Sequence, residues 1–413
     1  MALTDGRELI EPSWYGEHGP PHDIWSQLRR ESPVHACEPP GYRPFWAITR
    51  HADICEISKR PETFSSAPGI FMPRKSDVLD PDGLGKMRVI IEMDPPEHRA
   101  IRKVTSPWFT PRALGRVDAA VDQSARALVD RMAADGGQGE CDFATDIAAA
   151  HPLRILSTIL GVPQSEEPRI LRLTNQLFAD DDPELQREGE DRVQAQRELG
   201  MELFQLFSEI VEDRRKNPRD DLASVIANGQ VDGAPMGPME TFGYYLITFT
   251  AGHDTTKNAL VGGMNALIRN PDALEQMRRD PERVPSAVEE IVRWTSPVNY
   301  MVRTATCDVE VGRQKIHQGD KLVMFYASAN RDEDIFEDPF AFRVDRDPNR
   351  HLGFGIGEHF CLGAHLARRS QRALFGELAR RLESVELAGE PDWIQSSFVV
   401  GLKHLPIRYR LKS

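Results

Sequence analysis

Cys361 lies in a segment that is rich in glycine. Four of the eleven residues from Gly353 to Gly363 are glycines, so the backbone can turn tightly there and let a flat or bulky group approach it closely. Apolar side chains recur after Cys361 in steps of four or multiples of four, which predicts a helix from Cys361 to Leu382. Because a helix dipole and its first N–H groups favour a thiolate, we expect Cys361 to be a good metal ligand.

Three kinds of cysteine site compete for this segment. A buried structural cysteine would leave the glycines unexplained. A zinc site made of His359, Cys361 and His365 has donors of the right type, but it lacks a fourth ligand at the customary spacing. A haem bound through one thiolate uses every feature, because the glycines admit the macrocycle and His359 can face a propionate.

A long apolar stretch contains a second set of candidate catalytic residues. Residues Met239–Asn270 hold no proline and would span about 48 Å as one helix. Gly252 and the paired Thr255 and Thr256 are poor helix formers, and a threonine hydroxyl can bond the carbonyl four residues back, so we expect a local opening of this helix. Asp254 places an acid beside the Thr255 alcohol at this point, and such a pair can relay protons.

The glycine-rich segment resembles the haem-binding signature of the cytochrome P450 monooxygenases. The matching string is Phe354-Gly-x-Gly-x-His-x-Cys361-x-Gly363-Ala364, and three further motifs in the family's order extend the resemblance over roughly Trp14 to Arg410. The resemblance implies a single haem domain over residues 1–413, mainly α with small β-sheets (α+β). It also implies heme b (iron protoporphyrin IX) as the cofactor, with Cys361 as the metal ligand and with Phe354 and Gly363 next to it.

On the long helix, the resemblance implies that the acid Asp254 and the alcohol Thr255 take part in the activation of O2. Thr255 would hold the bound dioxygen and Asp254 would supply protons, while Ala251 and Gly252 would line the oxygen groove. An enzyme that activates O2 on a thiolate haem needs such a relay. A non-catalytic haem-thiolate sensor, which is the alternative from another class, has no need for one.

Four basic residues match the family's partners of the haem propionates, which need cationic or N–H partners when they are buried. They are His98, Arg102, Arg303 and His359. On a predicted helix from Ser286 to Trp294, Glu290 and Arg293 are three residues apart and resemble the family's structural Glu-x-x-Arg pair. Many relatives add an arginine where this chain has Ala341, so Arg343 or Arg346 would have to replace it.

The substrate pocket is inferred from the family alignment alone. Its expected residues are mostly apolar, which favours a hydrophobic substrate that is held chiefly by burial. They are Ile70, Phe71, Met72, Ile247, Thr250, Val298, Asn299 and Val399. The last third of the chain is most similar to the branch that hydroxylates α-terpineol, so we expect a monoterpenoid, alkyl-aromatic or alicyclic substrate. The alternative is a larger lipid, such as a steroid or a fatty acid.

Electrons should come from another protein, because the chain shows no phosphate-cradling glycine loop after a strand. The resemblance implies an iron-sulfur ferredoxin with its NAD(P)H-dependent reductase. A basic stripe on the predicted last helix is a candidate docking surface for an acidic carrier, and a solvated helix face is the alternative. The stripe consists of Arg368, Arg369, Arg372, Arg380 and Arg381.

Composition limits the other partners. The chain has 413 residues, and 51 Lys plus Arg against 64 Asp plus Glu give a net charge of −13, which argues against a general nucleic-acid surface. Its most apolar run, Phe242–Ala251, is about half the roughly 20 residues that a membrane span needs. The N-terminus has no apolar secretory signal. We therefore expect a cytoplasmic monomer without a membrane or nucleic-acid partner.

Outside these motifs the sequence indicates secondary structure only approximately. Residues 112–214 are mostly helical in periodicity. The acidic run Asp180–Glu184 within them indicates a solvated loop. Phe45–Thr49 and Lys321–Phe325 are predicted strands.

Overall fold

The computed structural model describes residues 3–75, 89–134, 136–178, 182–185 and 192–412. The α-helices are α1 (Arg7–Ile10), α2 (Pro12–His18), α3 (His22–Glu31), α4 (His51–Ser58), α5 (Glu97–Lys103), α6 (Asp118–Ala133), α7 (Ala150–Ile159), α8 (Glu167–Phe178), α9 (Arg192–Lys216), α10 (Leu222–Ala227), α11 (Pro238–Arg269), α12 (Pro271–Arg279), α13 (Val284–Thr295), α14 (Tyr326–Ala329) and α15 (Ala364–Arg381). Short 3-10 or π segments are η1 (Ile90–Glu92), η2 (Ala113–Val117), η3 (Phe143–Ala148), η4 (Gln164–Glu166), η5 (Pro281–Arg283) and η6 (Gly357–His359).

The strands are short. They are β1 (Val34–Cys37), β2 (Phe45–Ile48), β3 (Phe64–Ser65), β4 (Gln138–Asp142), β5 (Gln230–Val231), β6 (Ala234–Pro235), β7 (Tyr300–Ala305), β8 (Val309–Val311), β9 (Gln314–Ile316), β10 (Lys321–Phe325), β11 (Leu382–Leu387), β12 (Asp392–Trp393), β13 (Leu402–His404) and β14 (Pro406–Leu411). The predicted strands at Phe45 and Lys321 are thus confirmed. The helical stretch 112–214 is interrupted by β4, which the sequence pattern did not indicate.

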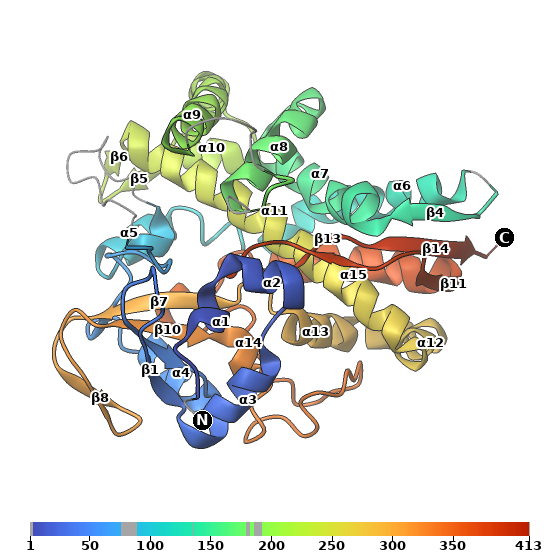
Figure 1. Ribbon diagram of the computed structural model, residues 1–413. Coiled ribbons are helices and arrows are strands. Elements are labelled where there is room, and N and C mark those ends of the chain that lie inside the picture. Colours follow the sequence, from blue (N-terminus) through green and yellow to red (C-terminus); the bar gives the residue numbers. More distant parts are fainter. Residues whose placement is uncertain (1–2, 76–88, 135, 179–181, 186–191, 413) are drawn as a thin grey trace.

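Helix α11 runs through the middle of the molecule (Figure 1). It has 32 residues, as expected, and Pro238 occupies its first turn, where a missing N–H costs nothing. The expected local opening is wrong, because every residue from Pro238 to Arg269 is helical. The expected side-chain bond is present, since Thr255 Oγ1 donates to the Ala251 carbonyl at 2.7 Å, and the helix accommodates it.

The apolar core lies around both halves of α11. Phe242, Tyr245 and Phe249 of its first half belong to a cluster with α7, α9 and α10. Leu260 and Met264 of its second half belong to another cluster with α6, α13 and α15. Buried apolar packing of both halves of α11 therefore fixes the position of the middle of the helix.

Two sheets carry the rest of the framework. The larger has the strand order β1-β2-β10-β7-β3, in which β10 is parallel to β2 and antiparallel to β7. The smaller is antiparallel and has the order β11-β14-β4, so β14 pairs with strands from two distant parts of the chain. Figure 1 shows β14 beside β4 at the end of the molecule opposite to β8.

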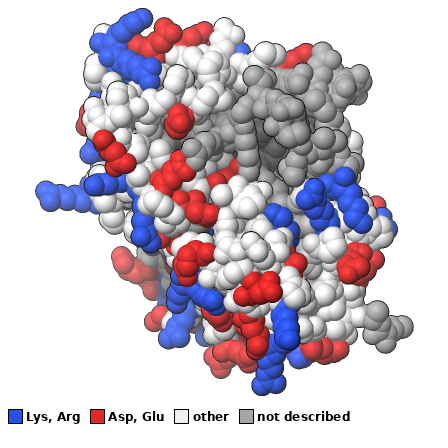
Figure 2. All heavy atoms as spheres, turned by 90° about the vertical axis from the view of Figure 1, so that its left-hand side faces the viewer, with Lys and Arg blue, Asp and Glu red and all other residues white. Residues whose placement is uncertain are grey.

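Surface charge and helix hydropathy are the features that a nucleic-acid or membrane partner would depend on. On the face that Figure 2 shows, Lys and Arg side chains lie among Asp and Glu side chains. Of the helices in the part of the chain that the structure describes, none combines the length and the apolar character that crossing a bilayer would require.

Candidate active site

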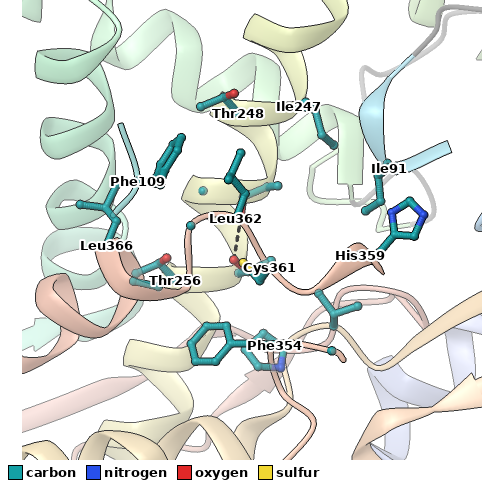
Figure 3. Close-up of a pocket in the computed structure, with 18 of the residues that line it drawn as sticks. Ile91, Phe109, Ile247, Thr248, Thr256, Phe354, His359, Cys361, Leu362 and Leu366 are labelled. Carbon is teal, nitrogen blue, oxygen red and sulfur yellow. Dashed lines mark hydrogen bonds between the residues drawn. The ribbon is translucent and has the colours of Figure 1, made fainter. Parts of the chain in front are cut away.

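A cavity lies beside the middle of α11, facing the loop that carries Cys361 (Figure 3). Its walls come from α11, from α7, from the residues around η1 and α5, from the start of β7, and from the Cys361 loop with the first turns of α15. Most of the lining is apolar. The site thus brings together segments that are far apart in the sequence.

The Cys361 loop is held in a tight conformation. The Cys361 N–H donates to the Phe354 carbonyl at 2.9 Å. Gly357 has a φ of 78°, and a Cβ there would lie 2.3 Å from the Ser58 carbonyl oxygen, so only glycine fits. A Cβ on Gly363 would meet open space instead, which leaves room for a group beside the cysteine.

Helix α15 begins at Ala364, so Cys361 precedes it by three residues instead of opening it as predicted. The N–H groups of Gly363 and Ala364 still bond the sulfur, and Arg102 and Arg368 lie near enough to favour the thiolate. Burial outweighs them and raises the pKa of the Cys361 thiol. The expected bonds from N–H groups to the sulfur are therefore present, while removal from water acts against the thiolate.

The side chains around Cys361 do not form a zinc site. Among the described residues, no three His, Cys, Asp or Glu side chains converge on one point. His359 Nε2 lies 3.2 Å from Ser66 Oγ, and its ring lies against His98, with 4.2 Å between the centroids. His365 is exposed on α15.

The four expected propionate partners all line the cavity: His98, Arg102, Arg303 and His359. Burial is the main cause that lowers the pKa of three of them. The pKa of His359 falls to about 3, and the pKa values of His98 and Arg303 also fall. Arg102 donates to the Phe360 carbonyl at 2.5 Å. A group that carries carboxylates would add counter-charge and hydrogen-bond acceptors at this cluster.

One atom tests this fit directly. His98 Nδ1 lies 3.4 Å from Glu358 Oε1, but His98 Nε2 is buried and has no hydrogen-bond partner among the residues that the structure describes. A buried ring nitrogen without a partner is costly, and an acceptor in the cavity would satisfy it. Together with the open space at Gly363 and the apolar walls, this fits a flat, largely apolar macrocycle with acidic side chains.

The expected Glu290–Arg293 pair is present and fully buried, with Nε and Nη2 of Arg293 each 2.7 Å from a Glu290 oxygen. Arg346 provides the third side chain, with Nε 3.1 Å from Glu290 Oε2, and the Arg343 backbone N–H adds a bond of 2.8 Å. Burial raises the pKa of Glu290, but the arginines outweigh it and the net direction is down. Arg346 thus makes the contact that Ala341 cannot make.

Helix α11 presents one face to the cavity. The residues on this face recur in steps of three and four, namely Tyr244, Ile247, Thr248, Ala251, Gly252, Thr255, Thr256 and Ala259. Ile247, Ala251, Gly252 and Thr255 were expected to line the site, and all four line the cavity. Thr250 does not line the cavity, because it points away from this face and donates to the Leu246 carbonyl at 2.8 Å. Thr248 takes the place that was expected for Thr250.

Asp254 lies on a different face of α11 from Thr255. Its carboxylate is 3% exposed and does not line the cavity. Lys257 Nζ lies 2.8 Å from Asp254 Oδ1, and His253 Nδ1 lies 3.5 Å from the same atom. Burial raises the pKa of Asp254, but Lys257 and His253 outweigh it and hold the pKa well below its ordinary value. His253, for which the sequence indicates no role, thus contacts the acid.

Five other expected pocket residues do not line the cavity. The Ile70 carbonyl accepts from the Val302 N–H, so the adjacent side chains alternate: Ile70 and Met72 are buried, and Phe71 is 47% exposed against Phe398. Buried Asn299 donates to Tyr15 Oη and to the Ser397 carbonyl, both at 2.8 Å. Val399 is buried and forms a bridge with Val298, which does line the cavity as expected.

Several lining residues were missed by the sequence reasoning. They include Ile90, Ile91, Phe109, Thr248 and Met301. The apolar Val89–Ile91 run just before the expected anchor at His98 was a usable signal, and Thr248 follows from the helical step to Gly252. Phe109 carries no signal in its own neighbourhood, because its place depends on how the chain after α5 returns to α11.

The expected basic stripe on α15 is not free. Each of its five arginines contacts a carboxylate. Arg368 and Arg372 contact Glu289, Arg369 contacts Asp118, Arg380 contacts Glu377, and Arg381 contacts Asp130 and Glu377. Helix α15 therefore presents ion pairs and not a continuous positive surface.

The acidic run is only partly described, because Asp180 and Asp181 lie outside the described residues. Asp182 is fully buried and accepts from the Gln395 N–H at 3.0 Å and from Lys403 Nζ at 3.3 Å. Glu184 contacts Lys403 at 3.2 Å and His404 at 2.8 Å. The expectation of a solvated loop is wrong for Asp182, because its charge is compensated by the β13 strand.

Comparisons with known proteins agree with this geometry. Residues 11–410 match the family model of cytochrome P450. Cytochrome P450-terp of a Pseudomonas species is 38% identical over 98% of this chain and 96% of its own length. A methyl-branched lipid omega-hydroxylase of Mycobacterium tuberculosis is 38% identical over 93% of this chain and 90% of its own length.

Among solved structures, CYP108D1 from Novosphingobium aromaticivorans has a TM-score of 0.88 and 38% identity, covering 99% of this chain and 98% of its own. The chain belongs to the cytochrome P450 family. It is a haem-thiolate monooxygenase, and the expected α+β fold with a long central helix is confirmed.

Proposed function

We propose that this monooxygenase hydroxylates a small hydrophobic compound, namely a monoterpenoid, an alkyl-aromatic or an alicyclic molecule. The observation that supports the proposal best is the apolar lining of the cavity that also contains Cys361, to which Ile91, Phe109, Ile247 and Met301 contribute. Such a wall binds a ligand chiefly by removing its apolar surface from water. The likeness to cytochrome P450-terp agrees with this substrate class.

In this proposal heme b is bound through Cys361, with Phe354 and Gly363 beside it. When bound, a thiolate-ligated haem supplies the activation of O2 for insertion of one oxygen atom into a C–H bond. His98, Arg102, Arg303 and His359 bind the propionates. His98 and Arg303 are buried, Arg102 and His359 are partly buried, and their charge-assisted contacts would orient the group in the cavity.

Residues of α11 handle the protons in this proposal. The Thr255 hydroxyl lies on the cavity face and holds dioxygen, and Ala251 and Gly252 leave room beside it. Asp254 supplies protons, for which its carboxylate must exchange the contact with Lys257 for a contact with Thr255 or with water. The two electrons come from an iron-sulfur ferredoxin with its NAD(P)H-dependent reductase.

A panel of ligands tests the substrate class. Purified haem-loaded protein is titrated with monoterpene alcohols, alkylbenzenes, steroids and fatty acids, and the change in the spin state of the iron is followed by absorption. We expect the terpenes or alkylbenzenes to give the larger spectral change and the tighter binding, and product analysis then identifies the oxidised carbon. Tight binding by steroids or long-chain acids alone would contradict the proposal.

A larger lipid is the second candidate substrate. The likeness to a methyl-branched lipid omega-hydroxylase favours it, because that relative is as similar in identity as cytochrome P450-terp. A long substrate would have to extend beyond the apolar lining near Cys361. The same titration separates the two candidates, because affinity for a lipid should then rise with chain length.

A further inference from the structure

Phe354, which lines the cavity together with Cys361 (Figure 3), carries an arginine against its ring. The guanidinium carbon of Arg368 lies 4.3 Å from the centroid of the Phe354 ring, which is a cation–π contact. Arg368 does not itself line the cavity, so it contacts the ring from outside the cavity wall. Because the Phe354 carbonyl accepts from the Cys361 N–H at 2.9 Å, a positive charge is held close to the segment that carries the sulfur.

Glu289 of α13 fixes the orientation of this arginine. Arg368 Nε lies 2.7 Å from Glu289 Oε1 and Arg368 Nη2 lies 2.8 Å from Glu289 Oε2, so the ion pair is bidentate. His351 Nε2 lies 3.1 Å from Glu289 Oε2, and 5.9 Å separate the centroids of the His351 and Phe354 rings. Burial raises the pKa of Glu289, but His351 and Arg368 outweigh it and lower the pKa to about 2. The carboxylate is therefore ionised at neutral pH.

Water reaches the two charges of this pair only in part. The side chain of Arg368 is 20% exposed and that of Glu289 is 24% exposed. Arg368 also lies near enough to Cys361 to favour its thiolate. Because a partly buried charge is screened less than a fully exposed one, both charges contribute to the electrostatic potential at the sulfur. Arg368 favours negative charge there and Glu289 opposes it.

An ion pair between two helices can also serve the fold alone. Arg369 and Arg381 of α15 form such pairs with carboxylates of α6. The Glu289–Arg368 pair differs from them, because its guanidinium also lies over the Phe354 ring in the cavity wall. This contact connects the charge of the pair to the site.

We propose that Glu289 and Arg368 are positioning residues that set the reduction potential of the haem iron held by Cys361. One electron converts ferric to ferrous iron and adds one negative charge to the site. Arg368 stabilises that charge and raises the potential, whereas Glu289 lowers it, and the contact with Phe354 keeps Arg368 in place. The proposal rests on the proposed ligation of haem by Cys361 and is independent of the substrate class.

The midpoint potential of the haem-loaded, ligand-free protein tests the proposal without turnover. It is measured by titration with dithionite in the presence of redox mediators, followed by absorption. We expect Arg368→Met to lower the potential and Glu289→Gln to raise it, each changing the ferrous-to-ferric ratio at a fixed potential by roughly threefold or more. Arg368→Lys keeps the charge and should restore most of the potential. Arg369→Gln is the matched control and should leave the potential unchanged, because Arg369 is the next arginine of α15 and pairs with Asp118 instead.

Shifts of opposite sign exclude a merely structural role, because loosening the contact between the helices would move both variants in the same direction. Shifts of the same sign, a missing shift in either variant, or an equal shift in Arg369→Gln would overturn the proposal. If Arg368→Met does not take up haem, Glu289→Gln compared with Arg369→Gln decides alone. Failure of the proposed haem ligation would be seen separately, because the unmodified protein would then lack the red-shifted band of its reduced carbonyl adduct.

Discussion

Asp254 and Thr255 are neighbours in the sequence, yet only Thr255 lines the cavity, while the Asp254 carboxylate is buried against Lys257 at 2.8 Å. Asp254 lies outside the arc of α11 that carries Ala251, Gly252, Thr255 and Thr256, so its carboxylate does not reach the cavity wall. The acid is therefore kept ionised on one side of α11 and the alcohol is presented on another. Proton supply from Asp254 requires that the carboxylate leave Lys257.

Thr255→Ala removes one of the two adjacent side-chain hydroxyls, those of Thr255 and Thr256, that α11 offers at this point of the cavity face. We expect the variant to bind substrate as the unmodified protein does but to divert electrons to hydrogen peroxide, with product formation per electron pair reduced by about tenfold or more. Thr250→Ala is the matched control, because Thr250 makes the same bond to a carbonyl four residues back but does not line the cavity. The relay assignment fails if Thr255→Ala remains fully coupled.

Lys257→Met should destabilise the fold, because it leaves the buried Asp254 carboxylate without its main counter-charge. We expect the free energy of unfolding at pH 7 to fall by about 3 kcal/mol, measured by urea denaturation. Lys216→Met is the control, since the Lys216–Glu212 pair at 3.8 Å is exposed on both sides and its loss should have little effect. Equal losses in the two variants would contradict the structural role of Lys257.

Cys361→Ser tests the metal ligand. We expect the haem-supplied variant to lose the red-shifted absorption band of the reduced carbonyl adduct, because an alcohol cannot replace the thiolate at iron. Cys307→Ser serves as the control, since Cys307 is exposed and lies outside the cavity. Retention of that band in Cys361→Ser, or its loss in Cys307→Ser, would refute the assignment.

His404 should make stability depend on pH. Its Nδ1 lies 2.5 Å from Asp142 Oδ2 and its Nε2 lies 2.8 Å from Glu184 Oε1, and the bond to Asp142 is the main cause that raises the pKa of His404. The charged ring therefore stabilises the fold fully below the unfolded pKa of about 6.5, and this contribution is lost as pH rises through the raised pKa of the folded state.

We expect His404→Gln to lower the free energy of unfolding at pH 6 by less than about 1 kcal/mol, because the ring is partly exposed, and to have almost no effect at pH 9. Urea denaturation at both pH values measures the difference. His317→Gln is the control, since His317 contacts Asp308 at 3.5 Å on the open surface. A His404→Gln deficit that grows with pH would have the wrong sign.

The parts of the site that local sequence specifies were predicted, and the parts that depend on tertiary packing were not. Glycine at 357 and 363, the Cys361 sulfur and the length of α11 follow from residue types and spacing. Whether Phe71 faces a cavity or solvent depends instead on how its neighbours pair with β7. For Thr248 the information was present, because its phase relative to Gly252 is a property of the helix.

Ion pairs, too, could be predicted where both residues are close in the sequence and not where tertiary packing brings them together. The Glu290–Arg293 pair lies within one helix and could be read from its spacing. The partners of Arg369 and Arg381 are Asp118 and Asp130 of α6, which no spacing rule connects to α15. Strand β4 was missed for a similar reason, because its partner strand is remote in the sequence.

The central place of β14 in the small sheet has a consequence for how the protein is made. Leu405 donates to Asp142, 263 residues earlier in the chain, at the point where β14 begins to pair with β4. At a synthesis rate of roughly 5–20 residues per second, β4 waits on the order of tens of seconds for this strand. Until β14 has left the ribosome, the edge of β4 that pairs with it has no partner strand, and an open strand edge is a place where other chains can pair.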